Sequence, residues 1–394
     1  MSWKDDFGFT DRLRVIQSLT TAYQKTSSTP TSAFADAMVK AKQIETQAYN
    51  QATTRDVYDL ICQQAIDEAE AAGSAEPVPG SLEHAEDDFN EPENSIGEVI
   101  GQYASCHRHY SGLHSIIYRS KLPDGTIGAL KVTIPHMMAA PHDVHREVRL
   151  LREASHAHII PLIETFNLVG GRFVLVFPFV RYDFDRLLRQ EMVTAAQTRS
   201  ILRDMFRALA HLHGLGILHR DIKPSNILME SPNGPAYLAD FGISWKEGDA
   251  GSEPPEQKIT DVGSTCYRAP EILFGFKGYG EALDLWAAGC VVAEAISVGH
   301  HQLFDSGPVG SDLSLIFSIF KTMGTPDEQR WPEVRVLPDW GKVEFHSYPP
   351  RTWEDILPGA SSNGRDLVSQ LVRYESSERL SAAEALNHPY FAAT

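Results

Sequence analysis

The sequence predicts an α+β fold preceded by a small helical bundle. Three observations lead to this prediction. Residues from about 11 to 72 show helical periodicity, no strand-like alternation and almost no glycine. From about residue 96 the pattern changes to strands, and the second half of the chain is helical with one long loop. At 394 residues the chain is long enough for one large domain and a small one.

The segment 1–72 predicts three short amphipathic helices. A first apolar stripe covers residues 13–23, and a turn rich in Ser, Thr and Pro at 26–31 ends it. A second stripe covers residues 34–48. Thr53 and Thr54 can cap a third helix, which continues the same apolar spacing. We expect the three helices to form a bundle.

Residues 73–95 differ in composition from both neighbours. They are rich in Glu, Asp, Pro, Ser and Gly, and few apolar side chains are available to offset the entropy of ordering. This composition predicts a flexible acidic linker, and an acidic docking segment is the alternative.

A predicted hairpin and the helix after it carry the first residues whose chemistry suggests a function. Residues 115–119 and 127–132 predict two strands joined by a Pro-Asp-Gly turn at 123–125. Lys131 lies in the second strand as the last residue of an Ala-x-Lys sequence, and Glu147 lies on the next predicted helix. A Lys–Glu pair of this kind holds the lysine against the α- and β-phosphates of a nucleotide. Each residue alone is a weak signal, because exposed Lys and Glu on neighbouring elements are common.

A further strand leads to a segment that suits a nucleotide. Residues 173–177 predict a buried strand, which continues extended through Phe179 and Val180. That connection would expose backbone groups to an adenine, and Asp183 follows where a ribose hydroxyl could be reached.

The residues with the clearest chemistry lie at 219–226 and 240–242. Phosphoryl transfer needs an acceptor for a hydroxyl proton, a cation near the phosphate, and oxygen ligands for Mg2+. Asp221 can supply the first, Lys223 the second, and Asn226 with Asp240 the third. An isolated Asp-Phe-Gly is a poor signal, whereas this combination of loops is a strong one. The alternative is a surface loop rich in polar turn residues.

Composition narrows the range of partners. The 52 acidic and 35 basic residues give a formal charge of −17, which argues against direct binding of nucleic acid or an anionic membrane. Four scattered cysteines show no metal-ligand spacing and predict reduced thiols, as in the nucleus or cytoplasm. The N-terminus lacks the apolar stretch of a secretory signal. The longest apolar run, 285–298, contains Glu294 and predicts a buried helix rather than a membrane span.

Residues from about 96 to 391 resemble the eukaryotic protein kinases, and within them the cyclin-dependent kinase-like (CMGC) branch. The branch assignment rests on residues 267–271 and 324–339, which match that family closely. The resemblance implies a two-lobed fold, with an N-lobe at 96–178 and a C-lobe at 181–392. It also implies ATP and Mg2+ at the lobe junction, and protein substrates. Lys223 two residues after Asp221 matches the serine/threonine-specific subgroup.

The resemblance also implies roles for individual residues. It suggests that Glu271 pairs with Arg379 and that Asp284 anchors the loop at 219–226. The implied catalytic residues are Asp221, Lys223, Lys131, Glu147 and Ser264. The implied nucleotide contacts are Gly112, Ile117, Ala129, Lys131, Phe179, Val180, Asp183 and Leu228, and the implied Mg2+ ligands are Asn226 and Asp240.

The phosphate-covering loop departs from the family pattern. A Gly-x-Gly-x-x-Gly motif would place its glycines at Tyr110, Gly112 and Ser115, so one glycine of three is present. Glycine lets the backbone approach phosphates without a Cβ, and we expect weaker or differently shaped nucleotide contact, though not its loss. The inhibitory Thr-Tyr pair of many cyclin-dependent kinases is replaced by Leu113 and His114, so that brake is predicted to be absent.

The activation segment departs as well. Arg146 and Arg220 match two of the three arginines that hold a phosphate in the family, but Trp245 stands at the third position. The usual phosphorylation site aligns near Ile259, with Thr260 adjacent. We therefore expect a weaker partner for a phosphorylated threonine, and no requirement for phosphorylation.

Two further features bear on substrates and regulation. Gly263 and Arg268 could build a pocket that favours proline after the phosphoacceptor. The helix that carries Glu147 lacks the family's cyclin-docking sequence, and residues 142–145 resemble an ordinary helix start. The hypothesis is a cyclin-independent kinase that is constitutively poised and acts on other cyclin-dependent kinases, although the sequence leaves cyclin dependence open.

The N-terminal bundle resembles another family. Residues 41–45, together with Tyr49, Tyr58 and Ile61, resemble the second and third helices of the KIX domain of transcriptional coactivators. The resemblance implies a groove for activation-domain helices, with Tyr58 near it. The alternative is a bundle that merely docks on its neighbour, with Tyr49 and Tyr58 in its core. Two functional classes follow for the whole chain: an active serine/threonine kinase, or a kinase-fold scaffold that acts through this bundle.

Overall fold

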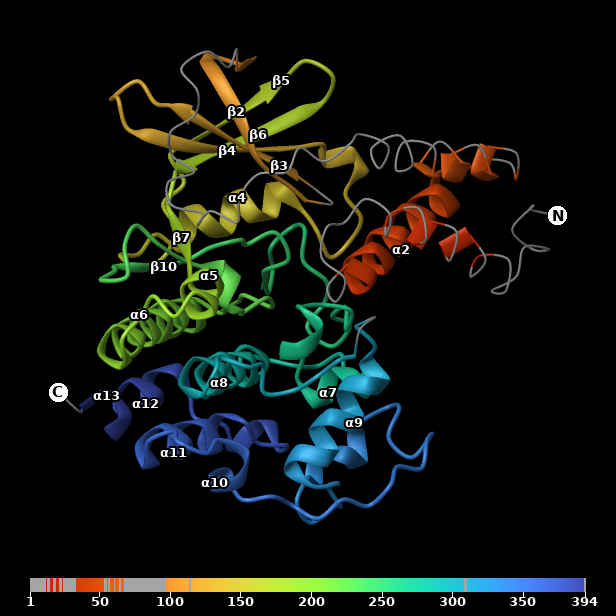
Figure 1. Cartoon of the computed structure of the whole chain (residues 1–394), viewed down its shortest axis with the longest axis vertical. Helices are drawn as coiled ribbons and strands as arrows, with labels where there is room; N and C mark the ends of the chain where they lie inside the picture. The colour runs from red at the N-terminus through yellow and green to blue at the C-terminus, as the bar shows by residue number, and fades with distance from the viewer. Residues whose placement is uncertain are drawn as a thin grey trace, which may run out of the picture. The chain divides into compact units, whose positions relative to one another are not determined.

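Figure 1 shows the computed structural model of the chain. The structure describes residues 97–392 apart from 113, 114, 308 and 309, and it describes helix α2 (Ala33–Gln51) with single positions from 12 to 23 and from 52 to 66. Contacts divide the chain into two units, one comprising 1–93 with 307–309 and the other 94–306 with 310–394. The predicted linker at 73–95 lies outside the described residues.

In the N-terminal unit, a buried carboxylate joins residues from all three predicted helices. Glu45 on α2 is fully buried and accepts two hydrogen bonds from the guanidinium of Arg12, each at 2.7 Å. The hydroxyl of Tyr58 donates to the same carboxylate at 3.0 Å. Helix α2 covers the predicted second helix, and Arg12 and Tyr58 are themselves helical. The described positions of the predicted first helix (12, 15, 16, 19, 20 and 23) and of the predicted third helix (55, 57–59, 61–63, 65 and 66) are all helical, and the other positions of these two helices lie outside the described residues.

Tyr58 differs from the expectation drawn from the KIX resemblance. Its ring is fully buried beside Ala48 and Cys62, and Tyr49 meets it edge-on with ring centroids 6.3 Å apart. A phenol that bonds a buried carboxylate is part of a core rather than of an exposed groove. Tyr58 therefore lies in the core of this unit, as the alternative interpretation expects.

The strand-rich part of the second unit is an antiparallel sheet of six strands, in the order β1-β2-β3-β4-β6-β5. The β3–β4 hairpin closes through the predicted Pro-Asp-Gly turn, with Gly125 at φ 89°. The strand bounds are Glu98–Ile100 (β1), Tyr103–Ser111 (β2), Ser115–Lys121 (β3), Ile127–Thr133 (β4), Glu164–Leu168 (β5) and Arg172–Pro178 (β6).

Helix α4 (Val144–Glu153) follows the hairpin and starts where the sequence predicts. Asp143 caps it by accepting hydrogen bonds from the backbone amides of His145 and Arg146. The helix buries apolar residues, and it also buries Arg146 and Glu147. Buried charged side chains need partners, so we expect partners for Arg146 and Glu147 on the segments that pack against α4.

The helical part of the second unit lies below the sheet in Figure 1. Its α-helices are Phe184–Arg189 (α5), Ala195–Gly214 (α6), Pro270–Leu273 (α7), Ala282–Ile296 (α8), Asp312–Met323 (α9), Trp353–Ile356 (α10), Ser362–Leu371 (α11), Ala382–Leu386 (α12) and Pro389–Ala392 (α13). Short 3-10 turns cover Pro135–Met137, Pro224–Asn226, Thr265–Tyr267, Pro332–Val336 and Ser376–Glu378. Short strands are Tyr182–Asp183 (β7), Ile217–Leu218 (β8), Ile227–Met229 (β9), Ala236–Leu238 (β10) and Trp245–Lys246 (β11).

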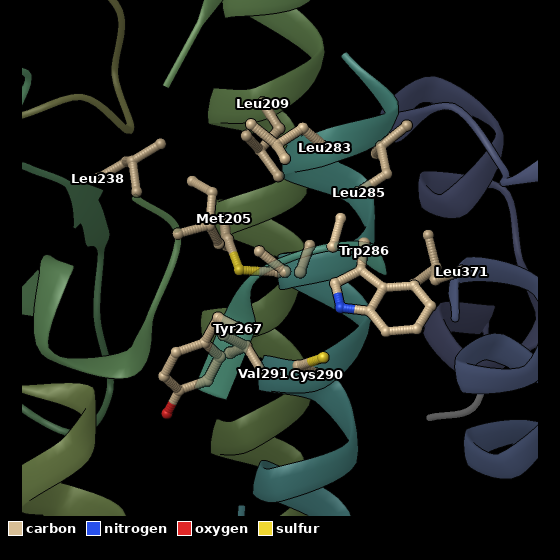
Figure 2. Close-up of a cluster of buried hydrophobic side chains, with 14 of the residues drawn as sticks. Met205, Leu209, Leu238, Tyr267, Leu283, Leu285, Trp286, Cys290, Val291 and Leu371 are labelled. Carbon is tan, nitrogen blue, oxygen red and sulfur yellow. The ribbon is translucent and has the colours of Figure 1, made fainter. Parts of the chain in front are cut away.

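Helix α8 is the centre of this part, as the long apolar run predicts. Figure 2 shows its side chains packed against those of α6, with Trp286 turned toward Leu371 of α11. Gly289 permits the close approach of α8 to α11, because a Cβ at this position would lie 2.8 Å from the Cβ of Leu371. In the described part of the chain, no helix is long and apolar enough to cross a lipid bilayer.

Two buried carboxylates fix the loops around this core, and both contacts were implied by the kinase resemblance. Arg379 donates to both carboxylate oxygens of Glu271 at 2.7 Å, and neither side chain is exposed to solvent. Asp284 at the start of α8 accepts from the backbone amides of His219 and Arg220 at 2.9 and 2.8 Å. Both expectations are confirmed, and Asp284 anchors the loop at 219–226 to the start of α8.

Candidate active site

A cleft of about 530 Å³ lies between the sheet and the helical part of the second unit. Side chains from β2, β3 and β4 line one side, and residues from the loops at 223–228 and 239–242 line the other. All eight residues that the resemblance assigns to nucleotide contact line this cleft: Gly112, Ile117, Ala129, Lys131, Phe179, Val180, Asp183 and Leu228.

The connection after β6 presents backbone groups to the cleft. The amide of Phe179 donates to the carbonyl of Ile127 at 2.9 Å and so faces the sheet. Successive residues of an extended chain point their backbone groups to opposite sides. By this alternation, the carbonyl of Pro178 and the amide of Val180 would face the other side, where a planar base can be recognised.

Asp183 lies at the end of this connection. One of its carboxylate oxygens accepts from the amide of Arg186 at 2.8 Å and caps helix α5. Burial raises the pKa of this carboxyl. The side chain lines the cleft while the cap holds it in place.

Lys131 joins the sheet, helix α4 and the loop after β10. Its ammonium lies 2.7 Å from Oε1 of Glu147 and 3.0 Å from Oδ1 of Asp240. Burial alone would lower the pKa of Lys131, but the charges of Asp240 and Glu147 raise it. The charge of Lys131 in turn lowers the pKa of Asp240, so both groups are ionised near neutral pH. The predicted Lys131–Glu147 ion pair is present.

Two residues of the site hold a left-handed backbone without being glycine. Arg220 has φ 70° and Asp240 has φ 64°. Such conformations cost free energy and persist where the surroundings impose them. Asp284 holds the amide of Arg220, and His219 packs edge-on against Phe241 at 5.0 Å between ring centroids. The two loops are thus fixed against one another.

Asp221, Lys223 and Ser264 form a closed triangle of contacts. The hydroxyl of Ser264 donates to Asp221 at 2.9 Å and accepts from the ammonium of Lys223 at 2.8 Å. Lys223 also lies 2.8 Å from the second oxygen of Asp221. A carboxylate beside a cation at the edge of the cleft suits proton transfer from a hydroxyl to a base.

Asn226 and Asp240 present oxygen atoms to the cleft. The amide nitrogen of Asn226 donates to the backbone carbonyl and a carboxylate oxygen of Asp221, at 2.8 and 3.1 Å. Those bonds orient the amide and leave its oxygen as the acceptor. The side chain of Asp240 is 50% exposed, and both residues line the cleft. One carboxylate and one amide oxygen match the preference of Mg2+ for oxygen ligands.

The turn between β2 and β3, where the family has three glycines, contributes a tyrosine to the cleft. Tyr110, which stands where the family has a glycine, lines the cleft and is 60% exposed. Gly112 donates from its amide to the carbonyl of Ser115 at 2.9 Å, which turns the chain between β2 and β3. The predicted loss of the inhibitory pair concerns residues 113 and 114, which fall outside the described residues.

Glu253 also belongs to the surroundings of the site, although no sequence pattern predicted it. Both oxygens of this carboxylate accept from the guanidinium of Arg220 at 3.1 Å, and Arg146 lies 3.8 Å away. Trp245 donates from its indole nitrogen to the backbone carbonyl of Glu253 at 2.8 Å, and Lys258 lies over the Trp245 ring at 4.5 Å. The only hint of this carboxylate in the sequence was that Arg146 and Arg220 match two arginines of the family while Trp245 stands at the third position.

Gly263 and Arg268 lie together beside the loop at 219–226. Gly263 has φ 78°, and its carbonyl accepts from Nε of Arg268 at 3.0 Å. A Cβ at Gly263 would lie 2.9 Å from the carbonyl oxygen of Arg220. Both the backbone conformation and the space thus require glycine.

Comparison with known proteins identifies the family. Residues 111–391 match the protein kinase domain. The chain is 33% identical to Cyclin-dependent kinase 20 of Danio rerio over 298 residues, which cover 74% of this chain and 84% of that protein. It is 38% identical to Serine/threonine-protein kinase csk1 of Schizosaccharomyces pombe over 240 residues, 60% of this chain and 77% of the relative. It is also 38% identical to Cyclin-dependent kinase D-1 of Oryza sativa subsp. indica over 249 residues, 62% of this chain and 55% of the relative. The chain therefore belongs to the protein kinase family, and it is a serine/threonine protein kinase related to the cyclin-dependent kinases.

Proposed function

We propose that this kinase transfers the γ-phosphate of ATP to serine or threonine hydroxyls of proteins through the cleft residues described above. The position of Lys131 carries the proposal. Its ammonium bonds Glu147, 16 residues away, and Asp240, 109 residues away. This arrangement places a fixed positive charge where the phosphates of a nucleotide would lie.

Each part of the nucleotide has a matching group. Ala129, Ile117 and Leu228 supply apolar contact for a base, and the backbone of Val180 supplies hydrogen bonds. Asp183 would bind a ribose hydroxyl. Lys131 would hold the α- and β-phosphates.

Asn226 and Asp240, which both line the cleft, would hold Mg2+. When bound, the ion neutralises charge on the phosphate oxygens. The salt bridge to Lys131 keeps Asp240 ionised and therefore ready to act as a ligand.

Asp221 would accept the proton of the substrate hydroxyl. Ser264 and Lys223 orient this carboxylate through the contacts at 2.9 and 2.8 Å. Lys223 would also offset negative charge near the transferring phosphate. The same groups restrain the base before substrate arrives, which favours productive geometry.

A phosphotransfer assay tests this function. The purified full chain, labelled ATP and Mg2+ are combined with a serine-proline peptide, and the variant Asp240→Ala is compared with wild type. Glu344→Gln is the matched control, because Glu344 is an exposed acid away from the cleft. Wild type and the control should transfer phosphate while Asp240→Ala loses at least about 100-fold in rate. Equal rates in wild type and Asp240→Ala would leave only the scaffold alternative, which the relatives named above do not favour.

Activity without a cyclin is part of the proposal. Arg149 of α4 forms two hydrogen bonds with Asp249, at 2.8 and 2.7 Å, and Lys246 bonds Glu153 at the end of the same helix. These contacts support α4 from within the chain. Addition of a cyclin should change the rate of the purified monomer by less than about twofold, and complete dependence on a cyclin would contradict this part.

Substrates and location follow as further proposals. Gly263 and Arg268 favour a proline after the phosphoacceptor, and we propose other cyclin-dependent kinases or transcription-related proteins as substrates. A substrate-peptide array with the monomer tests the proline preference. The four cysteines are unpaired, which suits the reducing nucleus or cytoplasm, and microscopy of the tagged chain tests this location.

The N-terminal unit has its own proposed role. We propose that it is a KIX-like bundle that binds an activation-domain helix. The Arg12–Glu45–Tyr58 network supports a joined bundle, because it links three helical segments. NMR titration of the full chain with such a peptide tests binding, and unchanged signals from residues 1–72 would remove the role.

A further inference from the structure

Glu253 lies at the meeting point of three segments. Arg220 belongs to the catalytic loop, next to Asp221, and both oxygens of Glu253 accept from it at 3.1 Å. Arg146 belongs to α4, next to Glu147, and lies 3.8 Å from the same carboxylate. Glu253 itself belongs to the activation segment. One carboxylate therefore links the neighbours of two proposed catalytic-site residues.

The two arginines need an anion. The Arg220 side chain has no exposure to solvent, and that of Arg146 is 2% exposed. Buried cations are costly unless they are paired. Burial would raise the pKa of Glu253, but the hydrogen bonds and charge of Arg220 bring it below its usual value, so the carboxylate is charged.

The backbone around Glu253 holds the carboxylate in position. Its carbonyl accepts from the indole of Trp245 at 2.8 Å, and its Oε1 lies 3.4 Å from the amide of Ile259. Two residues earlier, the carbonyl of Gly251 accepts from Arg146 at 2.5 Å. The segment is thus bonded to β11 and α4 as well as to Arg220.

Ordering of a kinase activation loop commonly depends on an added phosphate that pairs with arginines. Here the arginines already have an anion from the chain. Ile259, whose amide faces that anion, has no hydroxyl that could carry a phosphate. The pocket is formed and neutralised by unmodified residues.

We propose that Glu253 is a positioning residue that fixes Arg146 and Arg220, and with them α4 and the catalytic loop, so that the kinase is active with an unphosphorylated activation segment. This inference rests on the proposed phosphotransfer function and adds its mode of regulation.

The test compares kinetics of the full chain in four forms: wild type, Glu253→Gln, Glu253→Asp and Glu247→Gln. Glutamine keeps the size of Glu253 and removes its charge, whereas aspartate keeps the charge. Glu247 is an exposed acid on the same segment, so its variant controls for loss of one charge. Each preparation is treated with a broad-specificity phosphatase, which is then removed, and mass spectrometry verifies that the segment is unmodified.

The expected result is a loss in kcat without a matching change in the KM for ATP. Glu253→Gln should lower kcat about tenfold or more, because it removes charge-assisted hydrogen bonds. Glu253→Asp should recover most of this loss, and Glu247→Gln should match wild type within about twofold. A merely structural role would instead lower the fraction of folded enzyme and leave kcat per folded molecule unchanged.

The phosphatase arm uses wild type alone and so does not depend on the folding of any variant. Dephosphorylated wild type should keep its kcat. Loss of activity on dephosphorylation would overturn the inference, and so would a Glu253→Gln variant with the kcat of wild type. Absence of phosphotransfer in wild type both before and after treatment would contradict the proposed function itself, which separates the two failures.

Discussion

Lys223 donates a hydrogen bond from its ammonium to the hydroxyl of Ser264 at 2.8 Å. The two residues are 41 positions apart, and the same hydroxyl donates a hydrogen bond to Asp221 at 2.9 Å. The activation segment therefore takes part in orienting the proposed catalytic base. This dependence can be tested at a single hydroxyl.

Replacing Ser264 by alanine should lower kcat about tenfold, because Asp221 and Lys223 each lose a hydrogen bond that involves a charged group. Ser264→Thr keeps the hydroxyl and should retain activity within about twofold of wild type. Steady-state kinetics with a saturating peptide would measure both variants. Full activity in Ser264→Ala would show that the hydroxyl has no part in positioning the base.

Arg379→Ala should destabilise the fold strongly. It leaves the carboxylate of Glu271 buried without its partner, which costs about 3–5 kcal/mol. Arg335→Ala is the matched control, because its pair with Glu328 is exposed on both sides, at 70% and 63%. Thermal unfolding should show a large drop in the melting temperature for Arg379→Ala and almost none for the control. Equal small drops in both variants would contradict the importance of the buried pair.

Glu294 should make stability depend on pH. Burial raises its pKa to about 7, although the hydrogen bond from Tyr267 opposes the shift. Because the folded state favours the neutral acid, stability is greatest below the unfolded pKa and falls as pH rises toward 7. The full loss above pH 7 is about 3 kcal/mol as an upper figure.

Glu294→Gln removes the ionisable group and can still accept from Tyr267. Its melting temperature should exceed that of wild type at pH 8 by several degrees and match it closely at pH 5. Glu344→Gln should show no such difference between the two pH values. A wild type whose stability rises from pH 5 to pH 8 relative to Glu294→Gln would refute the sign of this prediction.

Gly263→Ala should weaken the preference for proline after the phosphoacceptor. Alanine at φ 78° costs about 1–2 kcal/mol, and its Cβ would meet the carbonyl of Arg220 at 2.9 Å. Gly248→Ala is the control, since Gly248 has the same φ of 78° with nothing within 4 Å of an added Cβ. The ratio of kcat/KM for serine-proline over serine-alanine peptides should fall only in Gly263→Ala. An unchanged ratio would remove Gly263 from substrate selection.

The sequence predicted those parts of the site in which the relevant residues are local or match a family motif. The loop at 219–226 carries Asp221, Lys223 and Asn226 within six residues, so local chain geometry alone keeps them close. The Lys131–Glu147 pair joins a strand to the next helix, 16 positions along the chain, and the order of these elements predicted it. The Glu271–Arg379 pair joins segments 108 positions apart, and only the family resemblance predicted it. Helix α8 was predictable because a long run that is apolar on every face, apart from Glu294, has to be buried.

Glu253 could not be predicted because its segment has no periodic pattern and no motif. Its partners lie 33 and 107 positions away, and acidic residues are common in polar loops. Tyr58 was misplaced for a different reason. Helical periodicity shows which face is apolar, but not which neighbour covers that face, and the buried Glu45 that receives the phenol looks like any exposed acid in the sequence.

The kinetics of Asp221→Asn in the isolated monomer test the central claim most directly. Asparagine keeps the shape of the side chain and cannot accept the proton of a substrate hydroxyl. With ATP, Mg2+ and a serine-proline peptide, kcat should fall by about 100-fold or more while the KM for ATP stays within a few-fold of wild type. An Asp221→Asn variant that transfers phosphate as fast as wild type would contradict the assignment of this cleft as the active site.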